Sequence, residues 1–211
     1  MQYQVIRRDL TETTRKCDFC PQHLTSLKAY VLKNLETGGL SYAGPTCAKN
    51  NAGEGSLSGV PDLTKFTFPK NDREGGGAGG GGGASEDNPE KRAIEYLMLR
   101  EYKLVDELNC SYSVLKKYYE KHNNQGLSEG DIRHINNIAA KAPENLSPAM
   151  LQRVYNYLFW IDVAIDKLPA EKTEFLTGVR STIVSKGKIS ERQTSSINKW
   201  LENIDGVPQL K

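Results

Sequence analysis

Three cysteines within the first fifty residues have the spacing of a metal site. Two residues separate Cys17 from Cys20, and this spacing lets both thiolates reach one ion. Cys47 follows in the stretch Gly44–Lys49, where Gly and Pro turn the chain before a short helix. Thiolates favour zinc in a tetrahedral shell. We therefore expect these three cysteines to bind zinc, against the alternatives of two disulfides or unrelated free thiols.

We predict His23, the nearest imidazole, as the fourth ligand. A complete treble clef would place that ligand near position 50, but Asn50 and Asn51 stand there. A surface histidine that binds no metal is the alternative for His23, and other donors remain open as ligands: Asp18, Cys110, His122 and His134. No Glu or His pair suited to activating a zinc-bound water accompanies the cysteines, so we expect a structural rather than a catalytic metal.

Basic and aromatic residues alternate through the same region. The first fifty residues hold seven Lys and Arg against four Asp and Glu, a local charge of +3. Bases stack on aromatic rings while cations neutralise phosphates, so this composition suits a single-strand groove. The alternative is that the tyrosines pack the hairpin and the charges solvate it. The predicted nucleic-acid contacts are Arg7, Arg8, Arg15, Lys16, Lys28, Tyr30 and Lys33.

No catalytic motif is recognisable in the sequence. Only three histidines are present, and none lies in a nucleophile or base motif. A phosphate-binding loop with its Lys and Ser or Thr is also lacking. We therefore expect a protein that is not an enzyme.

The elements that must position the cysteines are short strands and turns. Residues 29–32 and 40–43 flank Glu36-Thr37-Gly38-Gly39, which is typical of a β-hairpin. A Cys-x-x-Cys knuckle, a hairpin and then a Cys at the start of a helix is the order of a treble-clef-like module. We predict a small α+β zinc module over residues 1–70, whose core alone would give little stability without the metal.

A glycine tract at 75–83 predicts a flexible linker over residues 71–86, because ordering glycines costs more backbone entropy than ordering other residues. Residues 87–211 are predicted to form an all-helical bundle. Helix starts are indicated by Asn88-Pro89, Ser128, Ser147-Pro148 and Ser190, and the most apolar stretch, residues 155–165, is expected to be the central core helix. Cys110 is expected to be a small buried side chain within this bundle.

Two of these helix starts resemble each other at an offset of 62 residues. Leu127-Ser128-Glu129 leads to Ile135-Asn136, and Ile189-Ser190-Glu191 leads to Ile197-Asn198. The likeness indicates either a duplicated pair of helices or two independent helices that share a capping pattern.

Composition limits the possible location and partners. A net charge of +2 among 54 charged residues argues against indiscriminate binding to polyanions, so nucleic-acid contact requires a local patch. No apolar run is long enough for a membrane span, and the first residues lack the apolar core of a secretory signal. We expect a cytoplasmic protein without a membrane partner, located in the host cytoplasm if a phage encodes it.

The stretch from Cys17 to Lys49 resembles small zinc-binding domains of phage and bacterial proteins. These pair two cysteines with a hairpin carrying Tyr-Val, Thr-Gly and Gly-x-x-Cys, found here as Tyr30-Val31, Thr37-Gly38 and Gly44–Cys47. Some carry a helical tail with the Leu-Ser-Glu turn found here at 127–129. The resemblance implies a role in DNA transactions. A weaker similarity, in layout alone, is to phage single-stranded-DNA-binding proteins that help to recruit a polymerase.

The favoured hypothesis is thus an accessory protein of phage-type replication, recombination or transcription that binds nucleic acid, in particular single-stranded DNA. Its further partner would be a polymerase or another replication or transcription protein. The alternative is a zinc-stabilised adaptor that recruits or inhibits a polymerase or host factor without touching nucleic acid. An inhibitor of a host enzyme is a third reading without a sequence signature.

Overall fold

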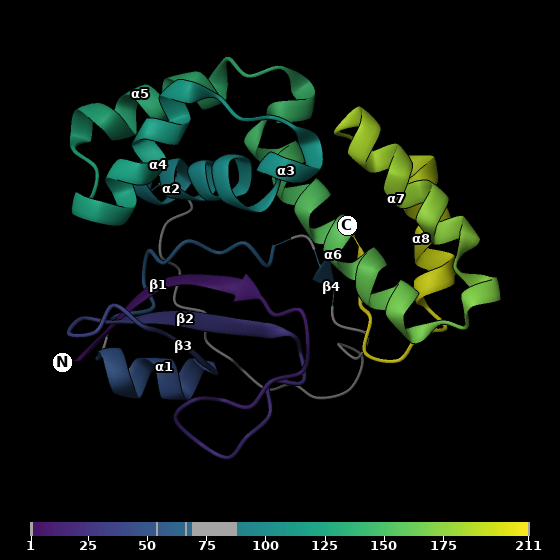
Figure 1. Ribbon diagram of the computed structural model, residues 1–211, viewed down its shortest axis with the longest axis horizontal. Coiled ribbons are helices and arrows are strands. Elements are labelled where there is room, and N and C mark those ends of the chain that lie inside the picture. Colours follow the sequence, from purple (N-terminus) through teal and green to yellow (C-terminus); the bar gives the residue numbers. More distant parts are fainter. Residues whose placement is uncertain (1, 54, 66, 69–87, 211) are drawn as a thin grey trace. The chain divides into compact units, whose positions relative to one another are not determined.

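The computed structural model describes residues 2–53, 55–65, 67–68 and 88–210, which divide into two compact units (Figure 1). The amino-terminal unit holds the described residues up to Thr64 together with 88–91. The helical unit holds Lys65, 67–68 and 92–210. The predicted linker at 71–86, with its glycine tract, lies outside the described residues.

A three-stranded antiparallel sheet forms the centre of the amino-terminal unit, in the order β1 (Tyr3–Leu10), β2 (Lys28–Asn34), β3 (Leu40–Ala43). The predicted hairpin joins β2 to β3. The Asn34 side chain accepts hydrogen bonds from the backbone N–H groups of Glu36 and Thr37, at 2.9 and 3.0 Å. Gly38 supplies the positive φ of +74° that the turn requires. The hairpin prediction is confirmed, and so is the α+β class.

Helix α1 (Pro45–Ala52) lies along one face of this sheet, as Figure 1 shows. Pro occupies its first turn, where a missing N–H costs nothing. The predicted short helix after Gly44 is therefore confirmed, and it carries Cys47. The buried core that joins helix, sheet and cysteine loop contains Cys17, Leu24, Ala29, Leu32, Ala43 and Ala48.

The free edge of β1 is covered by a short segment of the same unit. The backbone N–H of Arg8 donates to the carbonyl of Pro61 at 2.8 Å, and the N–H of Leu63 donates to the carbonyl of Arg8 at 3.0 Å. An edge strand with unpaired backbone groups would pair with other chains, and this segment prevents that along part of β1.

The helical unit is built from helices and one short strand pair. Its elements are α2 (Pro89–Met98), the π-helical turn η1 (Leu99–Lys103), α3 (Val105–Leu108), α4 (Ser113–Gln125), α5 (Glu129–Ala140), the 3₁₀ turn η2 (Glu144–Leu146), α6 (Pro148–Lys167), the 3₁₀ turn η3 (Ala170–Lys172), α7 (Glu174–Lys186) and α8 (Glu191–Leu201). The pair β4 (Thr67–Phe68) and β5 (Gln209–Leu210) is antiparallel and departs from the expected all-helical composition.

Helix α6 is the predicted core helix, and its burial confirms that expectation. Leu151, Val154, Tyr157, Trp160 and Ile161 are all at most 1% exposed. Their spacing of three and four residues places them along one side of a twenty-residue helix.

The segment from Ala93 in α2 to Glu101 in η1 is buried throughout. Its polar groups are satisfied internally. The Arg100 guanidinium donates to the Tyr96 hydroxyl at 2.7 Å and to the Cys110 carbonyl at 3.1 Å. The buried thiol of Cys110, predicted as a small core side chain, donates to the carbonyls of Arg100 and Leu104. Paired in this way, charged residues can occupy the interior.

Both capping boxes expected from the repeated pattern are present. At α5 the Ser128 side chain accepts from the N–H of Asp131, and the Asp131 carboxylate accepts from the N–H of Ser128. At α8 the same exchange links Ser190 and Gln193. Each box satisfies two backbone donors that the helix start leaves unpaired.

The capping box of α5 leads to a prediction about the stability of the protein at acid pH. The Lys121 ammonium, 2.6 Å away, and then the hydrogen bonds from Ser128 hold the pKa of Asp131 down to about 2. A carboxylate with a lowered pKa contributes stability that is complete above its unfolded value of 3.8 and is lost as pH falls toward 2. We expect the ¹³C signal of the Asp131 carboxyl to titrate near pH 2, and Lys121→Met to move that midpoint upward. Lys117→Met, at an exposed site on α4, should leave it unchanged; an Asp131 midpoint near 3.8 in the unaltered protein would contradict the assignment.

Candidate metal centre

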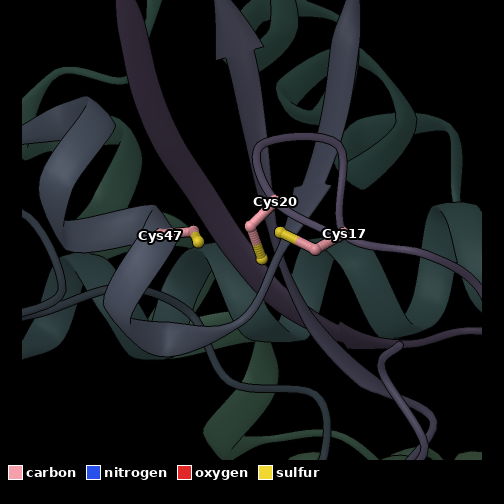
Figure 2. Close-up of side chains that lie close together, drawn as sticks. All are labelled: Cys17, Cys20 and Cys47. Atoms are coloured by element: carbon pink, nitrogen blue, oxygen red, sulfur yellow. The ribbon is translucent and has the colours of Figure 1, made fainter. Parts of the chain in front are cut away.

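The sulfur atoms of Cys17, Cys20 and Cys47 lie within 4.8 Å of one another. Figure 2 shows the first two on one loop and Cys47 on α1, with the three sulfurs around a common space. Cys17 is buried and the other two are half-buried. Zinc–sulfur bonds of about 2.3 Å in a tetrahedral shell hold sulfurs roughly 3.8 Å apart. The group is therefore close enough to hold one metal ion after a small inward movement.

A narrow backbone ladder shapes the loop that carries the first two cysteines. The N–H of Cys17 donates to the carbonyl of Gln22, and the N–H of Leu24 donates to the carbonyl of Arg15, both at 2.8 Å. The chain must reverse between these pairs, at Asp18 to Pro21. This reversal, which we call the knuckle (residues 15–24), brings Cys20 back beside Cys17.

Asp18 attaches the knuckle to strand β3. Its carboxylate accepts a hydrogen bond from the N–H of Tyr42 at 2.6 Å, and its own N–H donates to the carbonyl of Tyr42 at 2.9 Å. Arg15 lies 3.8 Å from the Asp18 carboxylate and 3.6 Å from the centre of the Tyr42 ring. Because β3 leads directly through Gly44 into α1, this attachment also fixes the distance from the knuckle to Cys47.

The thiols of Cys17 and Cys47 differ in acidity. Burial raises the pKa of Cys17, but hydrogen bonds from the backbone at Phe19 and Gly44 and from the other two thiols bring it below its ordinary value. The neighbouring Cys20, followed by burial, raises the pKa of Cys47 to about 12. Without a cation, one thiolate therefore forms readily and the next forms with difficulty. A metal ion relieves this conflict, because its positive charge attracts all three thiolates and competes with their protons.

His23, the sequence-predicted fourth ligand, is not part of the group. It pairs with Lys16 across the knuckle. Directly opposed residues of an antiparallel pair share a face, and the next residue along, Cys17, points to the other face. The His23 side chain is exposed, as this geometry requires.

The alternative fourth donors have other contacts. Asp18 accepts from Tyr42, and Cys110 is bonded inside the helical unit. The His134 ring lies 2.8 Å from the Tyr118 hydroxyl, and His122 is part of α4. Within the described residues, the group that could hold a metal therefore offers three ligands.

The predicted nucleic-acid residues fall into separate sets. Arg7 is buried and forms an ion pair with Asp9 at 2.8 Å, which leaves it inside the unit. Lys33 lies at the other end of β2, opposite Gln4 and Leu40. Arg15 and Lys16 belong to the knuckle, where Lys16 is exposed.

Arg8, Lys28 and Tyr30 lie together on one face of the sheet. Arg8 is paired across the strands with Tyr30, and Lys28 precedes Tyr30 by two residues on β2, so all three share a face. The Arg8 guanidinium lies 5.6 Å from the centre of the Tyr30 ring and 3.4 Å from Asp62. Burial lowers the pKa of Lys28, the positive charge of Arg8 lowers it further, and Asp62 offsets part of this effect. We call these three residues the Tyr30 face.

No protein family, curated protein or solved structure matches this chain. Among the described helices, none has the length and apolar character needed to cross a lipid bilayer. The likeness to phage zinc-binding domains thus stays a prediction.

Sequence reasoning did not find the structural role of Asp18 and Tyr42. Asp18 is predicted there only as a possible ligand, and Tyr42 only as part of the hairpin strand 40–43. The two residues are 24 positions apart in the sequence, so no local pattern predicts their contact.

The Asp18–Tyr42 contact predicts how the knuckle responds to substitution. Asp18→Ala removes a charged acceptor at a partly exposed site, and we expect a loss of about 1 kcal/mol in the local stability of the knuckle. Amide hydrogen exchange at Cys17 and Leu24 should then be roughly fivefold faster. Asp18→Asn keeps an acceptor oxygen and should show a smaller change. Equal exchange rates in Asp18→Ala and the unaltered protein would show that the contact does not hold the knuckle.

Proposed function

We propose that the three cysteines bind one structural zinc ion in a treble-clef-like module. The support comes from the thiol group itself, assembled from a knuckle and from the first turn of the helix that follows a hairpin. Thiolate-rich shells are typical of structural zinc. The described residues supply three of the four donors of such a shell. The role of the ion is to hold α1 and the knuckle to the sheet.

Metal analysis tests this proposal directly. Purified protein should carry one zinc per chain, Cys47→Ser should lose it, and both His23→Ala and the matched cysteine control Cys110→Ala should keep it. Affinity should fall as pH falls, because protons compete with zinc for the thiolates. Loss of zinc in His23→Ala would instead restore the histidine as a ligand.

Chelation provides an independent readout, because both tryptophans, Trp160 and Trp200, belong to the helical unit. Removing zinc should unfold the sheet, so that its amide NMR signals lose their chemical-shift dispersion, while tryptophan fluorescence stays unchanged. If the sheet keeps its NMR signals under strong chelation, zinc does not have the proposed structural role.

We further propose that this unit binds single-stranded nucleic acid, in particular DNA, through the Tyr30 face. The observation that carries this proposal is that two cations flank one half-buried aromatic ring on a single face. Arg8 and Lys28 bring two positive charges to this face against the single negative charge of Asp62, and a phosphate contact would offset that excess. The ring of Tyr30 would stack on a base. Arg7 and Lys33 have no part in this surface.

In this proposal the protein is an accessory factor of replication, recombination or transcription. The helical unit would supply a second contact to the strand or to a polymerase. Nothing in the Tyr30 face selects a base sequence, since stacking and phosphate contacts are sequence-tolerant.

Fluorescence anisotropy with a labelled oligothymidylate tests the Tyr30 face. Tyr30→Leu keeps an apolar side chain but removes stacking, and should weaken binding roughly 5- to 150-fold. Lys28→Met should reduce the slope of log affinity against log salt by about 0.7, while the matched control Lys33→Met on the same strand should not. No binding at low salt would overturn this proposal and leave the adaptor without nucleic acid as the remaining reading.

A further inference from the structure

The helical unit contains a depression of about 440 Å³ that none of the functions above uses. It lies among α2, α5 and the start of α6, and its volume is within the range of small-ligand sites. Apolar side chains, among them Tyr96, Leu99 and Ala139, make up most of its surface. These three are buried, so the walls belong to the packed core of the unit.

Two polar side chains, one on α2 and one on α6, line the same depression. Glu95 on α2 is 8% exposed and Gln152 on α6 is 4% exposed. Residues of these types are seldom buried to this degree. A carboxylate has about four acceptor positions, and a side-chain amide both donates and accepts. Both can therefore bond a ligand in addition to their neighbours in the protein.

Two cations lie at the mouth of the depression. Lys65 forms an ion pair with Glu95, with its nitrogen 2.9 Å from the carboxylate oxygen, and Arg92 is exposed on α2. The three charges sum to +1, so a ligand with a negative group is favoured there. Arg also presents a planar fork of donors that matches a phosphate.

We propose that this depression binds a nucleotide, with the base inside and the phosphate at its mouth. A base is flat and apolar on its faces and carries donors and acceptors along its edge, which suits apolar walls with Glu95 and Gln152 at one side. The phosphate meets Arg92. The nucleotide could be one residue of a bound strand or a free nucleotide. Only the first of these sources rests on the proposed function.

Titration of ¹⁵N-labelled full-length protein with adenosine 5′-monophosphate tests the site. Saturable shifts are expected at the amides of Tyr96, Ala139 and Ala140. Adenosine should bind more weakly than the monophosphate, since it lacks the group that meets Arg92. No saturable shift at these amides up to about 5 mM monophosphate would overturn the proposal.

Substitutions with matched controls localise the effect. Arg92→Glu should weaken the monophosphate at least tenfold and abolish its advantage over adenosine, while Arg192→Glu, at an exposed site on α8, should stay within twofold. Ala140→Trp places a bulky group at the depression and should also weaken binding, unlike Ala170→Trp at an exposed site in η3. Monophosphate binding unchanged in both Arg92→Glu and Ala140→Trp would refute the location.

An oligothymidylate titration separates the two sources. Shifts at the same amides with the oligonucleotide indicate a residue of the strand, and shifts with the mononucleotide alone indicate a free nucleotide; both agree with the shared chemistry. Tyr30→Leu should weaken strand binding but leave mononucleotide binding intact. The experiment therefore distinguishes a wrong proposal for the Tyr30 face from a wrong proposal for this depression.

Discussion

The contact between Asp18 and Tyr42 sets the geometry on which the amino-terminal unit depends. Two hydrogen bonds join the knuckle to the last strand of the sheet, and that strand continues through Gly44 into the helix that carries Cys47. The distance between the two halves of the thiol group is therefore fixed by protein contacts. A metal ion that binds there meets donors already gathered, so less of its binding free energy is needed to order the chain.

Local patterns in the sequence predicted the parts of this unit that depend on neighbouring residues. The hairpin followed from Glu36 to Gly39, and the three cysteines followed from their spacing. Strand alternation alone places Arg7 and Arg8 on opposite faces, but which of the two is buried did not follow from local patterns, because it depends on the register shift between Val5 and Arg7. The position of His23 also depends on pairing across the knuckle. His23 was predicted as a ligand because it is close to Cys20 in the sequence, but strand alternation places its side chain on the other face from Cys17.

In the helical unit, apolar periodicity located the core helix α6. It did not predict the burial of the polar residues in η1, which follows α2. Arg100 and Glu101 have the residue types of a solvated face, yet both are buried. The carboxylate of Glu101 accepts hydrogen bonds from the Ser111 hydroxyl and the Tyr112 N–H, both at 3.0 Å, and so satisfies the start of α4 from another element. Such a cap between elements has no signature along the chain, unlike the local boxes at Ser128 and Ser190, which the sequence indicated correctly.

The strand pair β4–β5 joins the beginning and the end of the helical unit. Thr67 and Phe68 pair with Leu210 and Gln209, and Asn198 both donates to and accepts from the backbone of Leu210 at 2.8 Å. The first and last described segments of this unit thus lie side by side. A circular permutation that joins them would need a connector of only a few residues, and new termini could be opened at the exposed Gly126, after the end of α4, without cutting a helix.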